Sequence, residues 1–164
     1  MEKYERIFES ENIDYINLNK SLIEDYLEMV NHPEVANKIS HNPRTYTYEE
    51  ELAWVNENLE KKKLIFSMIE KKTGEYIGNV EIMHMKNNIG EIGISITPKK
   101  QSKSFGTEAM KAIIKYGQEE IGLDGFELNV YKTNKKAIHC YEKVGFVQAG
   151  IGKTEDDSHM IYKK

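Results

Sequence analysis

The spacing of apolar residues predicts helices in the first third of the chain. Residues 22–30 place apolar side chains three and four positions apart, and Ser21 stands where an N-cap is expected. Residues 33–39 follow as a short helical or irregular turn. A longer helix is predicted after Thr47, because Glu50 stands three residues later, which is the spacing of a capping box.

Strand-like alternation precedes and follows these helices. Residues 3–9 alternate loosely and are predicted to form a first strand. Residues 64–69, 76–83 and 90–96 are apolar runs separated by turn residues. Such closely spaced runs predict a meander of three antiparallel strands.

The second half of the chain combines both periods. A helix is predicted to carry its apolar face over residues 110–121, and a strand follows at residues 126–131. Another helix runs from about residue 134 to residue 143 and ends at Gly145, a residue type that favours the C′ position. The tail, residues 146–162, is expected to hold two more strands around an acidic turn.

The predicted order of elements is β-α-α-β-β-β-α-β-α-β-β. An antiparallel meander followed by a strand–helix–strand crossover requires a mixed sheet with helices packed on it. We therefore assign the fold to the α+β class, with a central mixed α/β sheet of about six to seven strands flanked by about four helices. No repeat or linker interrupts the pattern, so residues 1–164 are expected to form a single domain.

Composition and charge exclude several classes of function. The chain has 23 Lys and Arg against 27 Asp and Glu, so it lacks the basic surplus of a general nucleic-acid binder. Cys140 is the single cysteine and the five histidines show no paired spacing, so we predict no disulfide framework and no metal. The N-terminus lacks the apolar segment of a signal peptide, and no apolar run approaches the ~20 residues that span a bilayer. We expect a cytoplasmic protein without a membrane partner.

A short loop of small and polar residues, Gln101–Ala109, joins a strand ending at Pro98 to the start of a helix. Unpaired N–H groups and the helix dipole favour negative charge at such a junction. Lys103 lies inside the loop, which therefore is a candidate site for a phosphate group. The alternative is an ordinary connection that serves only packing.

A second informative stretch runs from Asn134 to Phe146. Asn134 and Tyr141 are seven residues apart, two helical turns, and so share one face of the predicted helix. Each also has a structural explanation, since Asn134 suits an N-cap and Tyr141 suits a core position with its hydroxyl at the edge.

Together the two stretches resemble the GNAT superfamily of N-acetyltransferases. The resemblance rests on Gln101-x-x-Ser104-x-Gly106-Thr107, followed by Asn134-x-x-Ala137-x-x-x-Tyr141-x-x-x-Gly145-Phe146. Residues 31–35, 72–78 and 90–94 look like the subgroup that contains the ribosomal-protein N-terminal acetyltransferases and the spermidine acetyltransferases. The resemblance implies a GNAT-like fold over nearly the whole chain.

The resemblance implies that acetyl-CoA is the cosubstrate and lies in a V-shaped opening between the strands at residues 91–96 and 126–131. The pantetheine arm would pair with the first strand, the pyrophosphate would sit on the loop, and Asn134 would hydrogen-bond the pantetheine. Lysines at 99, 103, 135 or 136 are candidates to face the CoA phosphates. The implied cofactor-binding residues are Ile94, Ser95, Ile96, Gln101, Ser102, Lys103, Ser104, Phe105, Gly106, Thr107, Asn134, Lys136 and Tyr141.

One position departs from the family pattern. The family loop usually carries glycine where this chain has Ser104. A Cβ atom at this position limits the approach of the backbone to a pyrophosphate and disfavours a positive φ. The serine hydroxyl, however, is able to donate a hydrogen bond to a phosphate oxygen.

The resemblance also implies catalytic roles. Tyr141 would point its hydroxyl at the thioester sulfur, and a backbone N–H near Ile94 would stabilise the oxyanion. The attacking amine must lose a proton, and Glu81 or Glu91 on neighbouring strands are the candidate bases, with His84 behind them. Either carboxylate is equally suited to the solvated face of the sheet.

We therefore predict an acetyl-CoA-dependent N-acetyltransferase that moves the acetyl group directly to a primary amine through a ternary complex. The alternative is a non-catalytic acyl-CoA-binding or sensing module of the same fold. The acceptor remains open among peptide or protein N-termini, polyamines and other small amines, and residues 20–60 are expected to select it. A homodimer is one open arrangement, with Trp54 or the C-terminal strands as the expected contact.

Overall fold

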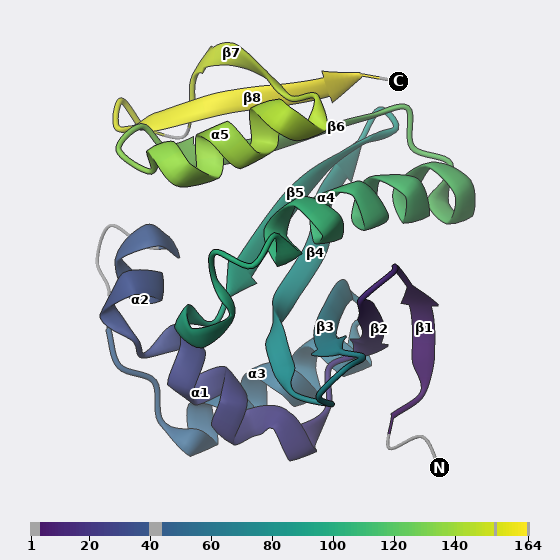
Figure 1. Ribbon diagram of the computed structural model, residues 1–164, viewed down its shortest axis with the longest axis vertical. Coiled ribbons are helices and arrows are strands. Elements are labelled where there is room, and N and C mark those ends of the chain that lie inside the picture. The colour runs from purple at the N-terminus through teal and green to yellow at the C-terminus, as the bar shows by residue number, and fades with distance from the viewer. Residues whose placement is uncertain (1–3, 40–43, 153, 164) are drawn as a thin grey trace.

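The computed structural model describes residues 4–39, 44–152 and 154–163, which build one eight-stranded sheet with helices on both faces (Figure 1). The strand order is β1-β2-β3-β4-β5-β6-β8-β7, and every neighbouring pair is antiparallel except β5 and β6, which are parallel. The sheet is therefore mixed, as the order of predicted elements required. Its strands are β1 (Arg6–Glu9), β2 (Ile13–Asn17), β3 (Leu64–Glu70), β4 (Tyr76–Lys86), β5 (Ile89–Ile96), β6 (Gly125–Tyr131), β7 (Val147–Ile151) and β8 (Asp157–Lys163).

Five α-helices accompany the sheet in the described residues. They are α1 (Ile23–Val30), α2 (Pro33–Ile39), α3 (Tyr48–Glu60), α4 (Phe105–Tyr116) and α5 (Lys135–Val144). Short 3-10 turns precede α1 (Lys20–Leu22) and α4 (Pro98–Lys100), and a π-helical turn (Gly117–Ile121) extends α4.

Two hydrophobic cores lie on opposite faces of the sheet, because successive side chains of a strand point to opposite sides. In β3, Phe66 and Met68 belong to the core that α4 and α5 cover, whereas Ile65 and Ile69 belong to the core under α1 and α3. Figure 1 shows α5 beside β6, β8 and β7 at one end of the molecule, and α1 to α3 toward the other end.

Several local predictions are confirmed. Thr47 and Glu50 form a complete capping box at the start of α3. Gly145 follows α5 with a φ of 124°, a conformation that favours glycine, and its N–H bonds back to Tyr141 O and Glu142 O. The tail forms the two predicted strands, β7 and β8.

The predicted numbers of strands and helices were slightly lower than those in the described part of the chain. Residues 6–17 form a hairpin of two strands where one strand was expected, and the expected turn at residues 33–39 is the helix α2. Lys3, the first residue of the predicted strand, lies outside the described residues.

The predicted cap at Ser21 was wrong. Asn19 instead accepts a hydrogen bond from the Ser21 N–H at 2.9 Å, at the start of the 3-10 turn that precedes α1. Trp54, expected to be exposed, is half-buried against the core under α1 and α3.

The central strands β5 and β6 part from each other, and this opening positions the site. Their pairing ends at Glu91 and Glu127, although β5 continues beside β4 to Ile96 and β6 continues beside β8 to Tyr131. Each strand therefore keeps one partner and loses the other. The result is a wedge between two parallel strands at the middle of the sheet.

Candidate active site

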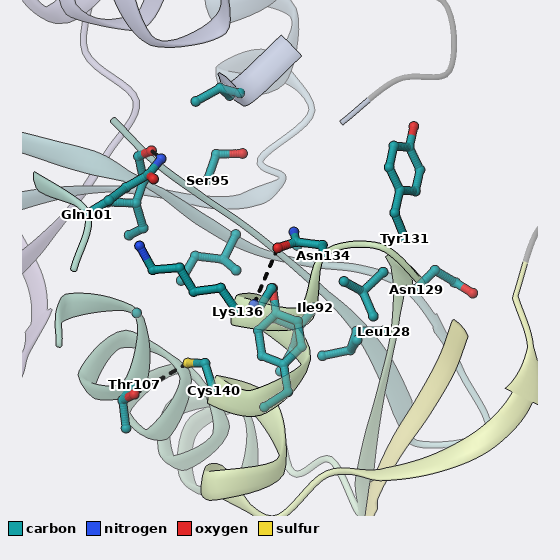
Figure 2. Close-up of a pocket in the computed structure, with 18 of the residues that line it drawn as sticks. Ile92, Ser95, Gln101, Thr107, Leu128, Asn129, Tyr131, Asn134, Lys136 and Cys140 are labelled. Carbon is teal, nitrogen blue, oxygen red and sulfur yellow. Dashed lines mark hydrogen bonds between the residues drawn. The ribbon is translucent and has the colours of Figure 1, made fainter. Parts of the chain in front are cut away.

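A cavity of about 840 Å³ lies at the parting of β5 and β6, and the start of α4 and one face of α5 close it. All the implied cofactor-binding and catalytic residues line this cavity except Lys103, whereas the further candidates Lys99, Lys135 and His84 are not part of its wall. Figure 2 shows side chains from these separate segments around one space. The predicted residues that line it are Glu81, Glu91, Ile94, Ser95, Ile96, Gln101, Ser102, Ser104, Phe105, Gly106, Thr107, Asn134, Lys136 and Tyr141.

The β5 wall presents backbone groups to the cavity. Ile94, Ser95 and Ile96 pair with β4 on one side and have no partner in β6 on the other. Gly78 of β4 permits this arrangement, because a Cβ atom there would lie 2.0 Å from the Ser95 carbonyl oxygen. An extended ligand beside β5 would satisfy the free backbone groups as an additional strand does.

The loop before α4 holds its shape through its own side chains. Gln101 donates from Nε2 to the Ile96 carbonyl at 2.9 Å and so ties the loop to the end of β5. Ser102 and Ser104 both adopt left-handed backbone conformations, with φ of 60° and 68°. The left-handed conformation disfavoured for Ser104 is thus the one it adopts, and its side chain is exposed and makes no cap hydrogen bond.

Helix α4 begins at Phe105, earlier than its apolar pattern suggested. Phe105, Gly106 and Thr107 therefore form its first turn, where N–H groups have no intrahelical partner and the dipole favours an anion. The cavity reaches all three of these residues. The predicted phosphate loop is therefore half loop and half helix N-terminus.

The positive charges around the cavity differ from the prediction. Of the four candidate lysines only Lys136 lines the cavity, and its ammonium donates to the Ser102 hydroxyl. Figure 2 shows Lys136 reaching from α5 toward the side of Gln101. Lys100, which was not a candidate, also lines the cavity, but its ammonium is held at 2.7 Å by both Glu70 and Glu75. Lys136 is thus the cation placed to meet a phosphate.

Asn134 and Tyr141 lie on the cavity side of α5, as their spacing predicted. Asn134 also caps the helix, because its Oδ1 accepts from the Ala137 N–H at 3.3 Å. Tyr141 packs near Phe146, with ring centroids 6.2 Å apart, and its hydroxyl makes no hydrogen bond to the described part of the chain. Burial, and to a smaller extent Cys140, raises the pKa of the Tyr141 hydroxyl.

The two candidate bases have different surroundings. Glu91 is buried and contacts His84 (Oε1 to Nδ1, 2.9 Å), while Asn129 donates to its Oε2 at 3.5 Å. Glu81 makes no hydrogen bond or ion pair with the described residues, and its carboxylate lies over Gly93 of β5. Burial and the nearby charge of Glu91 raise the pKa of Glu81.

Cys140 lies between the two helices that close the cavity. Its sulfur is 3.3 Å from the Thr107 hydroxyl, and Figure 2 shows this contact joining α4 to α5. A thiol in such a contact serves packing between the helices.

A second cavity of about 570 Å³ adjoins the first, under α1 and α3. The two cavities share Glu81, Gly93, Ile94 and Ser95, so they meet at the middle of β5. The acidic residues that the sequence places at positions 20–60 contribute Glu50, Glu51 and Glu57 to its wall. Only the tertiary structure reveals this cavity, because its wall is assembled from α1, α3 and three strands.

The structure also bears on metal and membrane binding. Within residues 4–39, 44–152 and 154–163, no group of three or more His, Cys, Asp or Glu side chains is arranged to hold a metal ion. In the same part of the chain, each helix is too short or too polar to cross a bilayer.

The sequence matches the acetyltransferase (GNAT) domain family over residues 16–147, which is most of the chain. The chain belongs to this family. The match confirms the predicted resemblance to the GNAT acetyltransferases at the level of the family.

Spermidine acetyltransferases are among its curated relatives. The chain is 38% identical to the spermidine N(1)-acetyltransferase of Escherichia coli (strain K12) over 79 residues, 47% of this chain and 42% of that protein. It is 31% identical to the corresponding Vibrio cholerae enzyme over 85 residues, 51% of this chain and 49% of that protein. The matches thus span less than half the length of these relatives, and they agree with the predicted spermidine acetyltransferase-like subgroup.

Solved structures show the same fold. A GNAT-family acetyltransferase from Bacillus anthracis superposes with a TM-score of 0.83 at 20% identity, covering 94% of this chain and 96% of that chain. The spermidine N-acetyltransferase of Vibrio cholerae, solved in complex with CoA and spermine, superposes with a TM-score of 0.82 at 21% identity, covering 93% and 95%. The predicted mixed-sheet GNAT fold is therefore confirmed, with eight strands and five helices in the described residues.

Proposed function

We propose that this protein transfers the acetyl group of acetyl-CoA directly to a primary amine. The observation that carries this proposal is the meeting of two cavities at Glu81, Gly93, Ile94 and Ser95. The first cavity reaches the loop and helix start at residues 101–107, which suit a phosphate group. The second cavity lies under α1 and α3. A donor in the first and an acceptor in the second would react where the two meet, without a covalent enzyme intermediate.

The wedge between β5 and β6 is the proposed donor site. The backbone of Ile94 and Ser95 on the side without a β6 partner is suited to pair with the amide groups of a pantetheine arm, next to the Ile96 carbonyl that Gln101 holds. Residues 101–107 offer the first-turn N–H groups of α4 to the pyrophosphate, and Lys136 adds a positive charge. The oxygen of the Asn134 side chain caps α5, which leaves its amide nitrogen to donate a hydrogen bond to the pantetheine.

Tyr141 is the proposed group that stabilises the leaving thiolate. Its raised pKa keeps the hydroxyl protonated at physiological pH, so it is suited to donate a hydrogen bond to sulfur as the carbon–sulfur bond breaks. A backbone N–H of β5 near Ile94 is the proposed donor to the oxyanion that forms on the carbonyl oxygen.

Glu81 is the proposed general base, ahead of Glu91. It lies at the junction of the cavities without a hydrogen-bond partner in the described chain, whereas Glu91 is engaged by His84 and Asn129. A carboxylate with a raised pKa is also a stronger base. Glu81 would take the proton that the ammonium must lose, directly or through water, before the new carbon–nitrogen bond forms.

A small cationic alkylamine is the acceptor that the surroundings favour. The second cavity carries several carboxylates, and relatives of this chain are named spermidine N(1)-acetyltransferases. A peptide N-terminus is the other class of amine that such an opening admits. Thiol release from acetyl-CoA with spermidine, a short peptide and an aminosugar would compare the candidate acceptors directly.

Calorimetric titration of acetyl-CoA separates the enzyme from a non-catalytic binding module. We expect micromolar binding to the wild type, weaker binding to Asn134→Ala, and also weaker binding to Asn134→Ser, which keeps a good helix cap but lacks the amide. Binding without thiol release in the presence of any amine would favour the binding module. Absence of binding would reject both functions.

A further inference from the structure

Besides Glu81 at its junction with the first cavity, the second cavity contains one further carboxylate that has no partner in the described chain. Glu51, on α3, is only 6% exposed and lines the cavity. The other two carboxylates of α3 that line the cavity are paired, Glu50 with Arg44 and Glu57 with Lys61 at 2.7 Å. The Glu51 side chain makes neither a hydrogen bond nor an ion pair with the residues that the structure describes.

Two phenols close enough to feel the charge of Glu51, those of Tyr26 and Tyr76, already donate their protons elsewhere. The Tyr26 hydroxyl is 2.6 Å from the Ser67 hydroxyl, which donates to the Asn79 side chain at 3.0 Å, so Tyr26 must donate to Ser67. The Tyr76 hydroxyl donates to the Met29 sulfur at 3.7 Å. Neither phenol therefore has a proton left for the Glu51 carboxylate.

A buried carboxylate without a partner is costly, and a cation is the ligand that removes this cost. Burial, followed by the neighbouring Glu50, raises the pKa of Glu51, as expected for a carboxylate that lacks a cation. Elsewhere in the wall the positive charge of Arg44 is already matched, because its guanidinium lies 4.4 Å from the centre of the Tyr46 ring and pairs with Glu50. The negative charge of Glu51, by contrast, has no positive partner among the described residues.

The rest of the wall suits an alkyl chain. Met29, Val30 and Ile65 line the same cavity, and Tyr26 and Trp54 add aromatic faces. Ile65 pairs across the sheet with Glu81, the residue at the junction with the donor site. One extended amine can therefore contact an apolar wall while its ends approach two separate carboxylates.

We propose that Glu51 binds the second ammonium group of a linear diamine or polyamine whose first amine lies beside Glu81 and accepts the acetyl group. This assignment rests on the acetyl transfer proposed above. It makes Glu51 a specificity-determining residue, because it selects amines with a distal positive charge over monoamines of the same length.

The test compares α,ω-diaminoalkanes of three to eight methylenes with monoamines in which a methyl group replaces one amino group. At saturating acetyl-CoA, we expect the preferred diamine to exceed its matched monoamine in kcat/KM by at least about tenfold in the wild type. Glu51→Gln should lower kcat/KM for the diamine by about 10- to 100-fold and change that for the monoamine by less than about threefold. Glu60→Gln is the matched control, since Glu60 is exposed on the same helix and lies outside the cavity wall.

Two further measurements keep the outcomes distinct. Calorimetric titration of the same diamine into the CoA-bound protein should show binding that Glu51→Gln weakens by about 10- to 100-fold and Glu60→Gln retains. Thermal unfolding of Glu51→Gln should show no loss of stability, because the substitution removes an unpaired buried charge. If the variant fails to fold, Glu51→Met provides a second neutral side chain of similar size.

Equal kcat/KM for diamines and monoamines in the wild type would overturn the assignment of Glu51, while acetyl transfer itself would stand. An equal loss for both amines in Glu51→Gln would overturn it as well. No thiol release with any amine, despite acetyl-CoA binding, would reject the acetyltransferase function. In that case Glu51-dependent binding of the diamine would still support the cation site, and its absence would reject it.

Discussion

Replacing Ser104 by glycine is expected to stabilise the protein. Ser104 adopts φ of 68° and ψ of 9°, a left-handed conformation that costs an L-residue about 1–2 kcal/mol. Glycine adopts this conformation without strain. Its greater conformational entropy in the unfolded chain, however, lowers the stability of the folded state by about 0.4–1 kcal/mol. The Ser104 hydroxyl makes no cap hydrogen bond, so its loss subtracts nothing from the folded state. The difference is a net stabilisation of about 0.5–1 kcal/mol.

Urea unfolding of the wild type, Ser104→Gly and Ser104→Ala measures this difference. Ser104→Ala is the matched control, because it removes the hydroxyl and retains the Cβ atom that causes the strain. A gain of 0.5–1 kcal/mol corresponds to a rise in Tm of about 1–4 °C for a domain of this size. Ser104→Ala should remain within about 0.5 kcal/mol of the wild type, as surface substitutions usually do.

The reasoning would be refuted if Ser104→Gly were no more stable than Ser104→Ala. That result would mean that the backbone around Ser104 is free of strain, and that the serine fits the loop as well as glycine does. The same proteins also report on the phosphate site, because the glycine variant opens the backbone at this position to a pyrophosphate. We expect Ser104→Gly to bind acetyl-CoA at least as tightly as the wild type in calorimetric titration.

Three further predictions concern the proposed chemistry. Tyr141→Phe should lower kcat by about 10²-fold while the free energy of unfolding changes by less than about 0.5 kcal/mol, because the hydroxyl has no hydrogen bond to the described chain; an unchanged kcat would remove Tyr141 from the mechanism. The raised pKa of Glu81 means that its base form appears only above the ordinary carboxyl pKa of about 4.3, so kcat/KM should rise with pH through the raised value and lose this rise in Glu81→Gln. A pH profile that Glu81→Gln leaves unaltered would assign the base elsewhere. Lys136→Ala should weaken acetyl-CoA binding several-fold and lessen its dependence on salt, whereas Lys103→Ala should change it little, and equal effects would contradict the geometry of the loop.

Local interactions made much of the fold predictable from the sequence. The capping box of Thr47 and Glu50 and the glycine that ends α5 involve residues within four positions of each other. The near-continuous apolar run of β3 is likewise the pattern expected of a strand that lies between two cores. The spacing of Asn134 and Tyr141 correctly predicted a shared helix face on one cavity.

The errors arose where several local signals competed. Ser21 is a good capping residue, but Asn19 two positions earlier takes that role and a 3-10 turn intervenes before α1. The strand predicted at residues 3–9 covers β1, but β2 was missed, since a strand of five residues gives only a short apolar pattern. Lys103 lies in the loop between two left-handed residues and does not line the cavity, whereas Lys136, which α5 brings from 33 residues later in the sequence, does.

The sequence by itself determined the mixed fold, the family and the stretches that carry the site. The spacing of apolar residues, the helix caps and the spacing of motif residues can all be read from residues that are close together in the chain. The tertiary structure alone decided how these stretches meet. Three features depend on residues far apart in sequence: the parting of β5 and β6, the contact of Glu91 with Asn129 38 residues later, and the lack of a partner for the Glu51 side chain among the described residues. Whether a carboxylate acts as base, ion-pair partner or ligand site is set by its neighbours in space and its burial, and neither is encoded at the residue itself.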